Sequence, residues 1–234
     1  MEVEKLKKAV GKEASFLVES GMRLGLGTGS TVAYFLVSLS ERLARGELAD
    51  IVGVASSVWT EERAGELGIS LTSLAENPVL DLTVDGADEV DPHLNLIKGL
   101  GGALLREKII AQASSRLAIM VDESKMVEQL GTKAPVPVEV VPFEWKIHLG
   151  FINSMGAEAI LRATSEGDAL VTDNGNFILD CYFNDGLQLP ERFEQELSLR
   201  SGIVESGLFM QMATEVLVGK VSGAVNTLYA KQGI

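Results

Sequence analysis

The sequence predicts an α/β fold: a Rossmann-like, doubly wound sheet as the main domain, with a smaller α+β, ferredoxin-like domain inserted near the C-terminus. Two observations predict the main domain. Short apolar stretches alternate with segments of helical periodicity, and a glycine-rich turn, GLGTGST, separates the first apolar stretch from the next helix. A third observation predicts the insertion, because a proline-rich boundary, APVPVEVVPFEW, precedes the order β-α-β-β-α-β.

The elements of the main domain are expected in alternating order. Gly21 and Gly68 each end a helix, and residues 95–98 form a short apolar link. In an open sheet of this kind, ligands bind at the carboxyl ends of the strands. The expected strands span residues 22–26, 51–55, 69–71, 80–84 and 117–121, and the expected helices span residues 3–19, 32–43, 59–67 and 103–115.

Past Pro135 the expected strands are residues 138–141, 158–163, 177–183 and 202–205, with helices at 144–155 and 190–200. The segment VTDNGN contains turn-forming residues and is expected to make a hairpin turn. The C-terminal segment GLFMQMATEVLVG returns to the main sheet as one or two strands. The expected domains are therefore residues 1–133 plus 208–234, and residues 134–207.

Composition and charge limit the partners of this chain. Its 234 residues are 46% hydrophobic and carry a formal net charge of −13. The negative electrostatic field of this charge disfavours binding to nucleic acid and to anionic membrane surfaces. No apolar run approaches the roughly 18 residues of a membrane span. The single cysteine, Cys181, cannot form an intrachain disulfide, which together with the charged N-terminus favours the cytoplasm.

The segment GLGTGST is the first candidate for binding. Its hydroxyl residues Thr28, Ser30 and Thr31 can cap the following helix, and its N–H groups form an anion site. A dinucleotide fingerprint would need a further glycine at Ser30 or Val32, and a P-loop would need Gly-Lys. Neither motif is present, so a generic phosphate loop and a tight turn with a capped helix remain as alternatives.

Residues 84–108, VDGADEVDPHLNLIKGLGGALLREK, hold most of the candidate chemistry. Asp85 ends a buried strand, Lys98 precedes three closely spaced glycines, and Glu107 lies on a helix face that is otherwise small or apolar. A carboxylate base and a lysine that faces a developing oxyanion suit proton abstraction next to a carbonyl group. With a phosphate loop, these groups predict a phosphorylated sugar as substrate.

Other interpretations of these polar residues remain open. Two of the three aspartates Asp85, Asp88 and Asp91 suit a magnesium ion that also binds substrate phosphate. Glu107 is also consistent with a solvated run of charges, and Lys125, just beyond strand 117–121, either meets an anion or lies on the surface. Two further carboxylates are expected to be solvated turn residues, Glu89 and Asp91.

The motifs also resemble a known family. GLGTGST, DGADEVD, KGLGGALLREKI, DESK, LGTKAPVPVEV, VTDNGN and SGIVESGLF are similar, in this order from Lys7 to Gly207, to motifs of ribose-5-phosphate isomerase type A. The resemblance implies interconversion of D-ribose 5-phosphate and D-ribulose 5-phosphate through a cis-enediolate, in the non-oxidative pentose phosphate pathway, without metal or cofactor. It also implies a homodimer, with a homotetramer as the alternative.

The resemblance further implies a role for each matching residue. Glu107 would carry the proton between C2 and C1, Lys98 would stabilise the enediolate oxygen, and Asp85 would assist opening of the furanose ring. Many members have glycine where Leu100 lies and a hydroxyl residue where Leu105 lies, but neither position supplies a reacting group. The implied substrate-binding residues are Lys7, Thr28, Gly29, Ser30, Thr31, Asp85, Gly86, Ala87, Asp88, Lys98, Gly99, Leu100, Gly101 and Lys125.

Two rival functions remain: another sugar-phosphate enzyme on a related fold, and a binding module from a different class. An amino-sugar phosphate isomerase or deaminase would need a catalytic histidine, for which His93 is the candidate near the carboxylates. A sugar-phosphate-sensing module of a transcription regulator would have a similar sheet without the chemistry. Such a module normally carries a DNA-binding helix-turn-helix, whereas here the N-terminal helix leads directly into the glycine loop.

Overall fold

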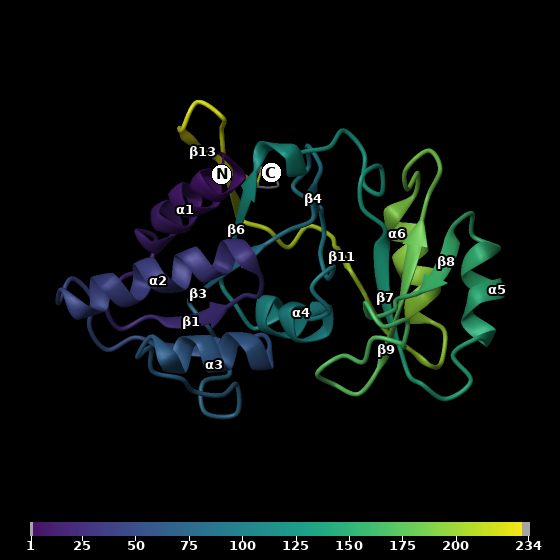
Figure 1. Ribbon diagram of the computed structural model, residues 1–234, viewed down its shortest axis with the longest axis horizontal. Helices are drawn as coiled ribbons and strands as arrows, with labels where there is room; N and C mark the ends of the chain where they lie inside the picture. The colour runs from purple at the N-terminus through teal and green to yellow at the C-terminus, as the bar shows by residue number, and fades with distance from the viewer. Residues whose placement is uncertain (1, 231–234) are drawn as a thin grey trace. The chain divides into compact units, whose positions relative to one another are not determined.

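The computed structural model describes residues 2–230, and the contacts among them define two compact units (Figure 1). The first unit contains residues 2–87, 106–126 and 211–230, and the second contains residues 88–105 and 127–210. The domain boundaries expected from the sequence remain a prediction. Among the described residues, no helix is both long enough and apolar enough to cross a membrane.

The first unit is built on a six-stranded sheet with the order β13-β12-β6-β3-β1-β2. Neighbouring strands are parallel except β12 and β13. The chain winds outward from β1 to β2 and then, on the other side of β1, through β3, β6 and β12. This confirms the predicted doubly wound α/β sheet. The strands are β1 Arg23–Leu26, β2 Val52–Ala55, β3 Leu82–Gly86, β6 Leu117–Asp122, β12 Glu215–Gly219 and β13 Val225–Tyr229.

Helices cover both faces of this sheet. Leu24 and Leu26 of β1 pack into the apolar cluster with α1 and α2, which lie side by side in Figure 1. Gly25 points to the other face, where a Cβ atom on it would lie 2.5 Å from Cγ2 of Ile110 in α4. The helices are α1 Glu2–Ser15, α2 Ser30–Ala44, α3 Val58–Glu66 and α4 Leu104–Gln112, and a short 3₁₀ helix, η1 Glu123–Lys125, follows β6.

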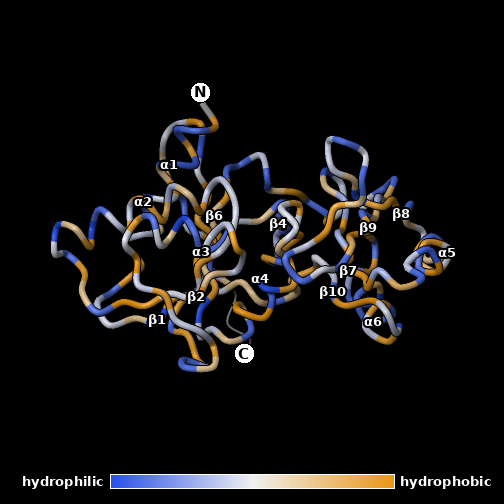
Figure 2. The backbone as a smooth tube through the Cα atoms, turned by 60° about the horizontal axis from the view of Figure 1, so that its bottom comes forward, coloured by the Kyte–Doolittle hydropathy of each residue, from blue (hydrophilic) through white to orange (hydrophobic). Residues whose placement is uncertain are grey.

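The second unit contains an antiparallel sheet with the order β10-β7-β9-β8. The chain order is β-α-β-β-α-β, which confirms the ferredoxin-like prediction. Ile152 of α5 and Phe193 of α6 pack against Val138 and Leu179 of the sheet. Both helices alternate between blue and orange in Figure 2, as helices with one apolar face do. The elements are β7 Val136–Val140, α5 Ile147–Asn153, β8 Glu158–Leu161, β9 Phe177–Tyr182, α6 Pro190–Ser198 and β10 Ile203–Ser206.

Some expected elements differ from those observed. Residues 69–71 do not form a strand, because Leu71 makes only an isolated parallel bridge to Gly53. The apolar link at 95–98 contains a strand, β5 Leu96–Ile97, which pairs with β4 Glu89–Val90 and β11 Leu208–Phe209. The partner β11 lies far along the chain, so local periodicity contained no sign of this small sheet.

His148 gives the second unit a predicted dependence on pH. The ring is buried on α5, and its Nδ1 accepts a hydrogen bond of 3.1 Å from Arg200 Nε. Burial, and then the charge of Arg200, lower the pKa of His148 from its ordinary value of 6.5. The unfolded chain therefore binds a proton near pH 6.5 that the folded chain does not bind until lower pH. Stability from this source is complete above pH 6.5 and is lost as the pH falls below it.

We expect the free energy of unfolding in urea to fall between pH 8 and pH 5.5, and to fall less in His148→Asn. Asparagine retains an oxygen that can accept from Arg200 but does not titrate. An unchanged pH slope in this variant would assign the loss to other groups.

Candidate active site

The glycine loop joins β1 to α2 at the carboxyl edge of the parallel sheet. Gly29, at φ +111°, is the N-cap of α2, and no side chain among the described residues caps this helix. The expected capping by Thr28, Ser30 or Thr31 is therefore wrong. The first N–H groups of a helix have no partner within it and can bind an anion. Lys7 Nζ lies 2.8 Å from Ser30 Oγ and brings positive charge to this helix end.

The Thr28 hydroxyl lies in a cluster of hydroxyl groups beneath the loop. Thr28 Oγ1 is 2.8 Å from both Ser56 Oγ and Ser57 Oγ, and 3.1 Å from Thr60 Oγ1. The Thr60 hydroxyl donates to the Gly27 carbonyl at 2.8 Å. The two serines and Thr60 are buried, so their hydrogen bonds to Thr28 and Gly27 fix the loop from its buried side. Sequence reasoning missed it, although serines directly after a parallel strand were a usable signal.

Asp85 lies against the same loop. It is 1% exposed, and its Oδ1 accepts hydrogen bonds from the N–H groups of Thr28 at 3.1 Å and Gly86 at 2.7 Å. A Cβ atom on Gly27 would lie 2.1 Å from this oxygen. The carboxylate therefore occupies the space that a side chain at Gly27 would need, and only glycine fits there.

We predict that Gly27→Ala displaces the Asp85 carboxylate. If Asp85 acts on the substrate, the kcat of the reaction at this site falls by at least about tenfold, because small displacements of reacting groups have large effects on rate. Gly65→Ala is the matched control. Gly65 lies within α3 with nothing near its Cβ position, so alanine is expected to stabilise the protein by about 0.4–1 kcal/mol and leave activity unchanged. Equal kcat for both variants would show that the close contact at Gly27 does not matter.

Glu107 lies in the first turn of α4 and is 5% exposed. Its neighbour Lys108 is 3% exposed, so the alternative of a solvated run of charges is wrong. One turn further, Ile110 packs against Gly25 of β1. This contact fixes α4 on the sheet, and its N-terminal turn, with Glu107, is set towards the carboxyl end of the strands because a crossover helix runs antiparallel to them.

Lys125 ends η1 directly after β6. Asp122 Oδ1 accepts from the Ser124 N–H at 2.9 Å and from the Ser124 hydroxyl, and Glu123 Oε1 accepts from Val221 N–H at 3.1 Å. These bonds fix the turn, and Lys125 is half-buried at its end. A lysine so placed can neutralise an anion at the carboxyl edge of the sheet.

Lys98 and the glycines after it belong to the second unit. Lys98 is 2% exposed, and its N–H donates to the Gly207 carbonyl at 2.9 Å. Its Nζ lies 5.3 Å from the centre of the Phe209 ring, a distance at which cation and ring attract each other. Gly99 has φ +102°, a conformation that favours glycine. The lysine is therefore held at both its backbone and its ammonium group.

Asp88 holds the chain that follows Lys98. Its N–H donates to the Ile97 carbonyl at 2.8 Å, and its Oδ2 accepts from the Leu100 N–H at 3.0 Å. Leu100 itself is 41% exposed, and Gly101 is also exposed. Asp88 thus supports the backbone around Leu100, and its expected contact with sugar hydroxyls stays a prediction. Gly86 and Ala87, half-buried, link it to Asp85.

Glu89 and Asp91 are not solvated, so that expectation is wrong. Glu89 is fully buried; its Oε2 accepts from Gly131 N–H at 2.6 Å, and its Oε1 accepts from the N–H groups of Lys133 and Ala134 at 2.5 and 2.7 Å. Asp91 is 8% exposed and accepts from backbone N–H groups two and four residues later. Both carboxylates anchor loops.

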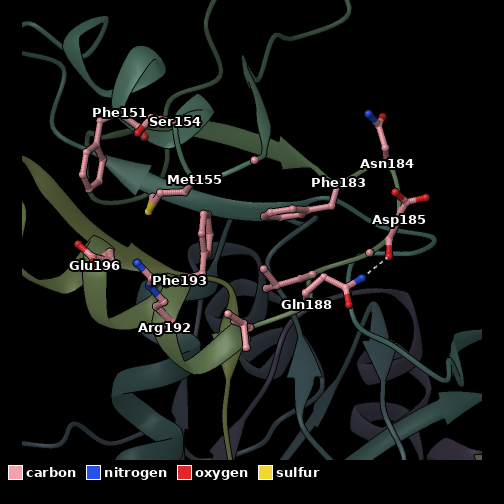
Figure 3. A pocket seen from close by; sticks show the side chains of 14 residues that line it. Phe151, Ser154, Met155, Phe183, Asn184, Asp185, Gln188, Arg192, Phe193 and Glu196 are labelled. Atoms are coloured by element: carbon pink, nitrogen blue, oxygen red, sulfur yellow. Dashed lines mark hydrogen bonds between the residues drawn. The ribbon is translucent and has the colours of Figure 1, made fainter.

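The second unit also contains a cavity of about 690 Å³, lined by residues of α5, α6 and the loop between β9 and α6. Figure 3 shows the Phe183 and Phe193 rings edge to face on its wall, and Gln188 donating to the Asp185 carbonyl at 2.9 Å. None of the residues expected in the site lines this cavity. The cavity has an apolar wall and is also lined by positively and negatively charged side chains. The glycine loop of residues 25–31 does not line it.

The remaining candidates for chemistry are the cysteine thiol and possible metal ligands. Burial, and then the nearby charge of Asp180, raise the pKa of the Cys181 thiol far above its usual range, so this cysteine is a poor nucleophile. Within residues 2–230, no three His, Cys, Asp or Glu side chains lie close enough together to hold a metal ion.

The chain is similar to known proteins in both sequence and structure. Residues 52–223 match the family model for ribose 5-phosphate isomerase A (phosphoriboisomerase A). The chain is 48% identical over 224 residues to ribose-5-phosphate isomerase A of Thermococcus kodakarensis, covering 95% of this chain and 97% of that protein. It is 49% identical over 218 residues to the Chloroflexus aurantiacus protein of the same name, covering 93% and 91%.

Solved structures are similarly close. Ribose 5-phosphate isomerase from Plasmodium falciparum superposes with a TM-score of 0.95 at 39% identity, covering 98% of this chain and 100% of that chain. A D-ribose-5-phosphate isomerase in complex with phospho-erythronic acid superposes with a TM-score of 0.94 at 45% identity, with the same coverage.

Proposed function

The chain belongs to the ribose-5-phosphate isomerase A family, and we propose how its own residues carry out the reaction of that family. The protein is an aldose–ketose isomerase that interconverts D-ribose 5-phosphate and D-ribulose 5-phosphate. We propose that the reaction passes through a cis-enediolate. Proton transfer by a carboxylate, with a lysine and backbone N–H groups facing the oxygen, is sufficient for this chemistry.

Glu107 is the proposed base. Its carboxylate removes the proton from C2 of the open-chain aldose, and the electron pair of that bond forms the C1–C2 double bond while charge develops on O1. The same carboxyl group returns the proton to C1, and the hydroxyl proton of O2 passes to O1. Lys98 faces the oxygen on which charge develops and stabilises the enediolate relative to the open-chain sugar.

Asp85 is proposed to assist opening of the furanose ring, and Asp88 and the backbone of residues 86–87 and 99–101 to line the sugar. The phosphate would bind the N–H groups at the start of α2 within residues 28–31, where Lys7 already contacts Ser30. Lys125 would supply further positive charge. These local positive groups are necessary, because the net charge of −13 repels an anionic substrate at long range.

One observation carries this assignment of roles. The buried Asp85 carboxylate accepts a hydrogen bond from the N–H of Thr28. The group proposed to act on the sugar ring and the loop proposed to bind its phosphate are therefore connected directly. A substrate with a ring and a phosphate group at a fixed separation fits this connection better than a sugar or a phosphate alone.

The experiment is an assay of D-ribose 5-phosphate conversion to D-ribulose 5-phosphate in the presence of EDTA. We expect full turnover in EDTA. Turnover that depends on added Mg²⁺ would contradict the metal-free mechanism and favour a magnesium ion bound by the aspartates of residues 85–91. Release of ammonia from glucosamine 6-phosphate would instead support the rival deaminase function, for which His93 is the candidate.

We further propose that the protein is a cytoplasmic homodimer, with a homotetramer as the alternative, and that it binds neither nucleic acid nor membranes. Size-exclusion chromatography with light scattering measures the mass of the assembly and so distinguishes the dimer from the tetramer, because one chain has a mass of 25.0 kDa. A mass of one chain at assay concentration would contradict both.

A further inference from the structure

Residues 99–102 form a turn that is fixed by its own backbone. The Gly102 N–H donates to the Gly99 carbonyl at 3.0 Å, and both glycines have positive φ, +102° and +85°. A Cβ atom on Gly99 would lie 2.7 Å from Cβ of Leu104. Such a turn places Leu100 and Gly101 at its tip, directly after Lys98.

Arg162 binds this turn from the β8–β9 side of the second unit. Its Nη1 donates to the Gly99 carbonyl at 2.8 Å and to the Leu100 carbonyl at 3.0 Å. The other side of the guanidinium is bound by Asp180 of β9, with Nε donating to Oδ2 at 2.8 Å and Nη2 donating to Oδ1 at 2.5 Å. The two side chains are 11% and 12% exposed. The guanidinium therefore bridges the sheet and the turn.

The strand pattern explains why these two side chains reach the turn. Leu179 and Cys181 of β9 pack into the cluster covered by α5 and α6, so Asp180 between them points to the opposite face. Arg162, just past β8, is joined to the same strand by its N–H, which donates to the Ile178 carbonyl at 2.8 Å.

A peptide unit is planar and trans, so its C=O and N–H point in opposite directions. Because the Gly99 carbonyl points to Arg162, the Leu100 N–H must point away from it, and there it donates to Asp88 Oδ2 at 3.0 Å. In the same way, the Leu100 carbonyl bound to Arg162 directs the Gly101 N–H away from the guanidinium. Arg162 thus determines the direction of two backbone N–H groups in the segment proposed to line the sugar.

We infer that Arg162, oriented by Asp180, is a positioning residue for the isomerisation: it fixes the peptide planes after Gly99 and Leu100, so that the Gly101 N–H is directed at the substrate. The inference rests on the proposed function, which places this backbone beside the sugar. Stability alone explains the arrangement poorly, because a buried ion pair contributes little net stability compared with apolar residues of similar size.

The decisive variant is Arg162→Lys. Lysine keeps the charge, but a single nitrogen cannot reproduce a two-point contact with Asp180 and reach both carbonyls. We expect kcat for D-ribose 5-phosphate to fall by about 10- to 100-fold, as for misplaced catalytic groups. We expect KM, and the inhibition constant of inorganic phosphate, to stay within about twofold, because the proposed phosphate-binding residues belong to the other unit. Arg192→Lys, on an exposed arginine of the same unit, is the control and should match wild type.

Asp180→Asn provides a second test that keeps Arg162 and the side-chain shape. It should lower kcat by a smaller factor than Arg162→Lys does. If Arg162→Lys does not fold, the kcat of Asp180→Asn tests the positioning role of Arg162. A kcat within twofold of wild type in the folded variants, or a kcat loss matched by weaker phosphate inhibition, would show a merely structural bridge. If wild type itself fails to convert ribose 5-phosphate, the proposed function fails first; if only the variants match wild type, this inference alone fails.

Discussion

Glutamine in place of Glu107 is expected to remove nearly all turnover while the substrate still binds. The amide has the shape of the carboxylate but cannot accept the C2 proton, and a positioned acid–base group contributes about 10²–10⁴ in rate. The side chain is 5% exposed, so a water molecule from bulk solvent cannot easily replace it. The measurements are kcat for ribose 5-phosphate and, by calorimetry on the inactive variant, its dissociation constant.

The control for this change is Glu62→Gln, which makes the same chemical change on an exposed residue of α3. It should leave both constants unchanged. Nuclear magnetic resonance in D₂O adds a direct test: we expect wild type to introduce deuterium from solvent into the sugar during proton transfer, and Glu107→Gln to introduce none. Retention of a tenth of wild-type turnover by Glu107→Gln would mean that another group is the base.

The main fold could be predicted from sequence because its signals are local. Apolar stretches and helical periodicity placed β1, β2, β6 and the first four helices within a few residues of their observed bounds. The small sheet of β4, β5 and β11 could not be predicted in this way. Its strands have two residues each, and Ile97 pairs with Leu208, so no periodicity within a short window reports the pairing.

The errors among the polar residues have the same cause. The polar neighbours of Glu89 in sequence predict a solvated turn residue. Glu89 is instead buried, and its carboxylate accepts hydrogen bonds from the N–H groups of Gly131, Lys133 and Ala134. A charge can be buried only where donors compensate its desolvation. Here those donors come from a distant loop, and the sequence around Glu89 carries no trace of them.

The candidate site divides in a similar way. Asp85, Lys98 and Glu107 could be proposed from the sequence because each combines a reactive group with unusual neighbours, either glycines or an apolar helix face, and their roles stay predictions. Arg162 and the hydroxyl cluster under Thr28 were missed, because these side chains support the loops from elements far away in sequence. Support of this kind depends on tertiary contacts, and only the structure revealed it.

Methionine in place of Lys98 is expected to lower kcat by about 10²–10³, the typical effect of removing one donor that faces a developing oxyanion. Methionine keeps the length of the aliphatic chain and is itself apolar, so the fold should be retained. KM should change less than kcat, because the charge on the enediolate develops only as the reaction proceeds. The measurements are kcat and KM for ribose 5-phosphate and the thermal unfolding midpoint.

Lys146→Met is a matched control, because Lys146 belongs to the same unit and also lies over an aromatic ring, 5.7 Å from the centre of Trp145, but is exposed. If the attraction between cation and ring were all that Lys98 provided, both variants would lose some stability and neither would lose turnover. We expect only Lys98→Met to lose turnover. Lys98→Arg should not restore it, because the guanidinium is planar and spreads its charge, whereas the ammonium is a compact charge. A kcat for Lys98→Met within threefold of wild type would remove the lysine from the mechanism and leave the backbone N–H groups of residues 99–101 as the donors to the enediolate.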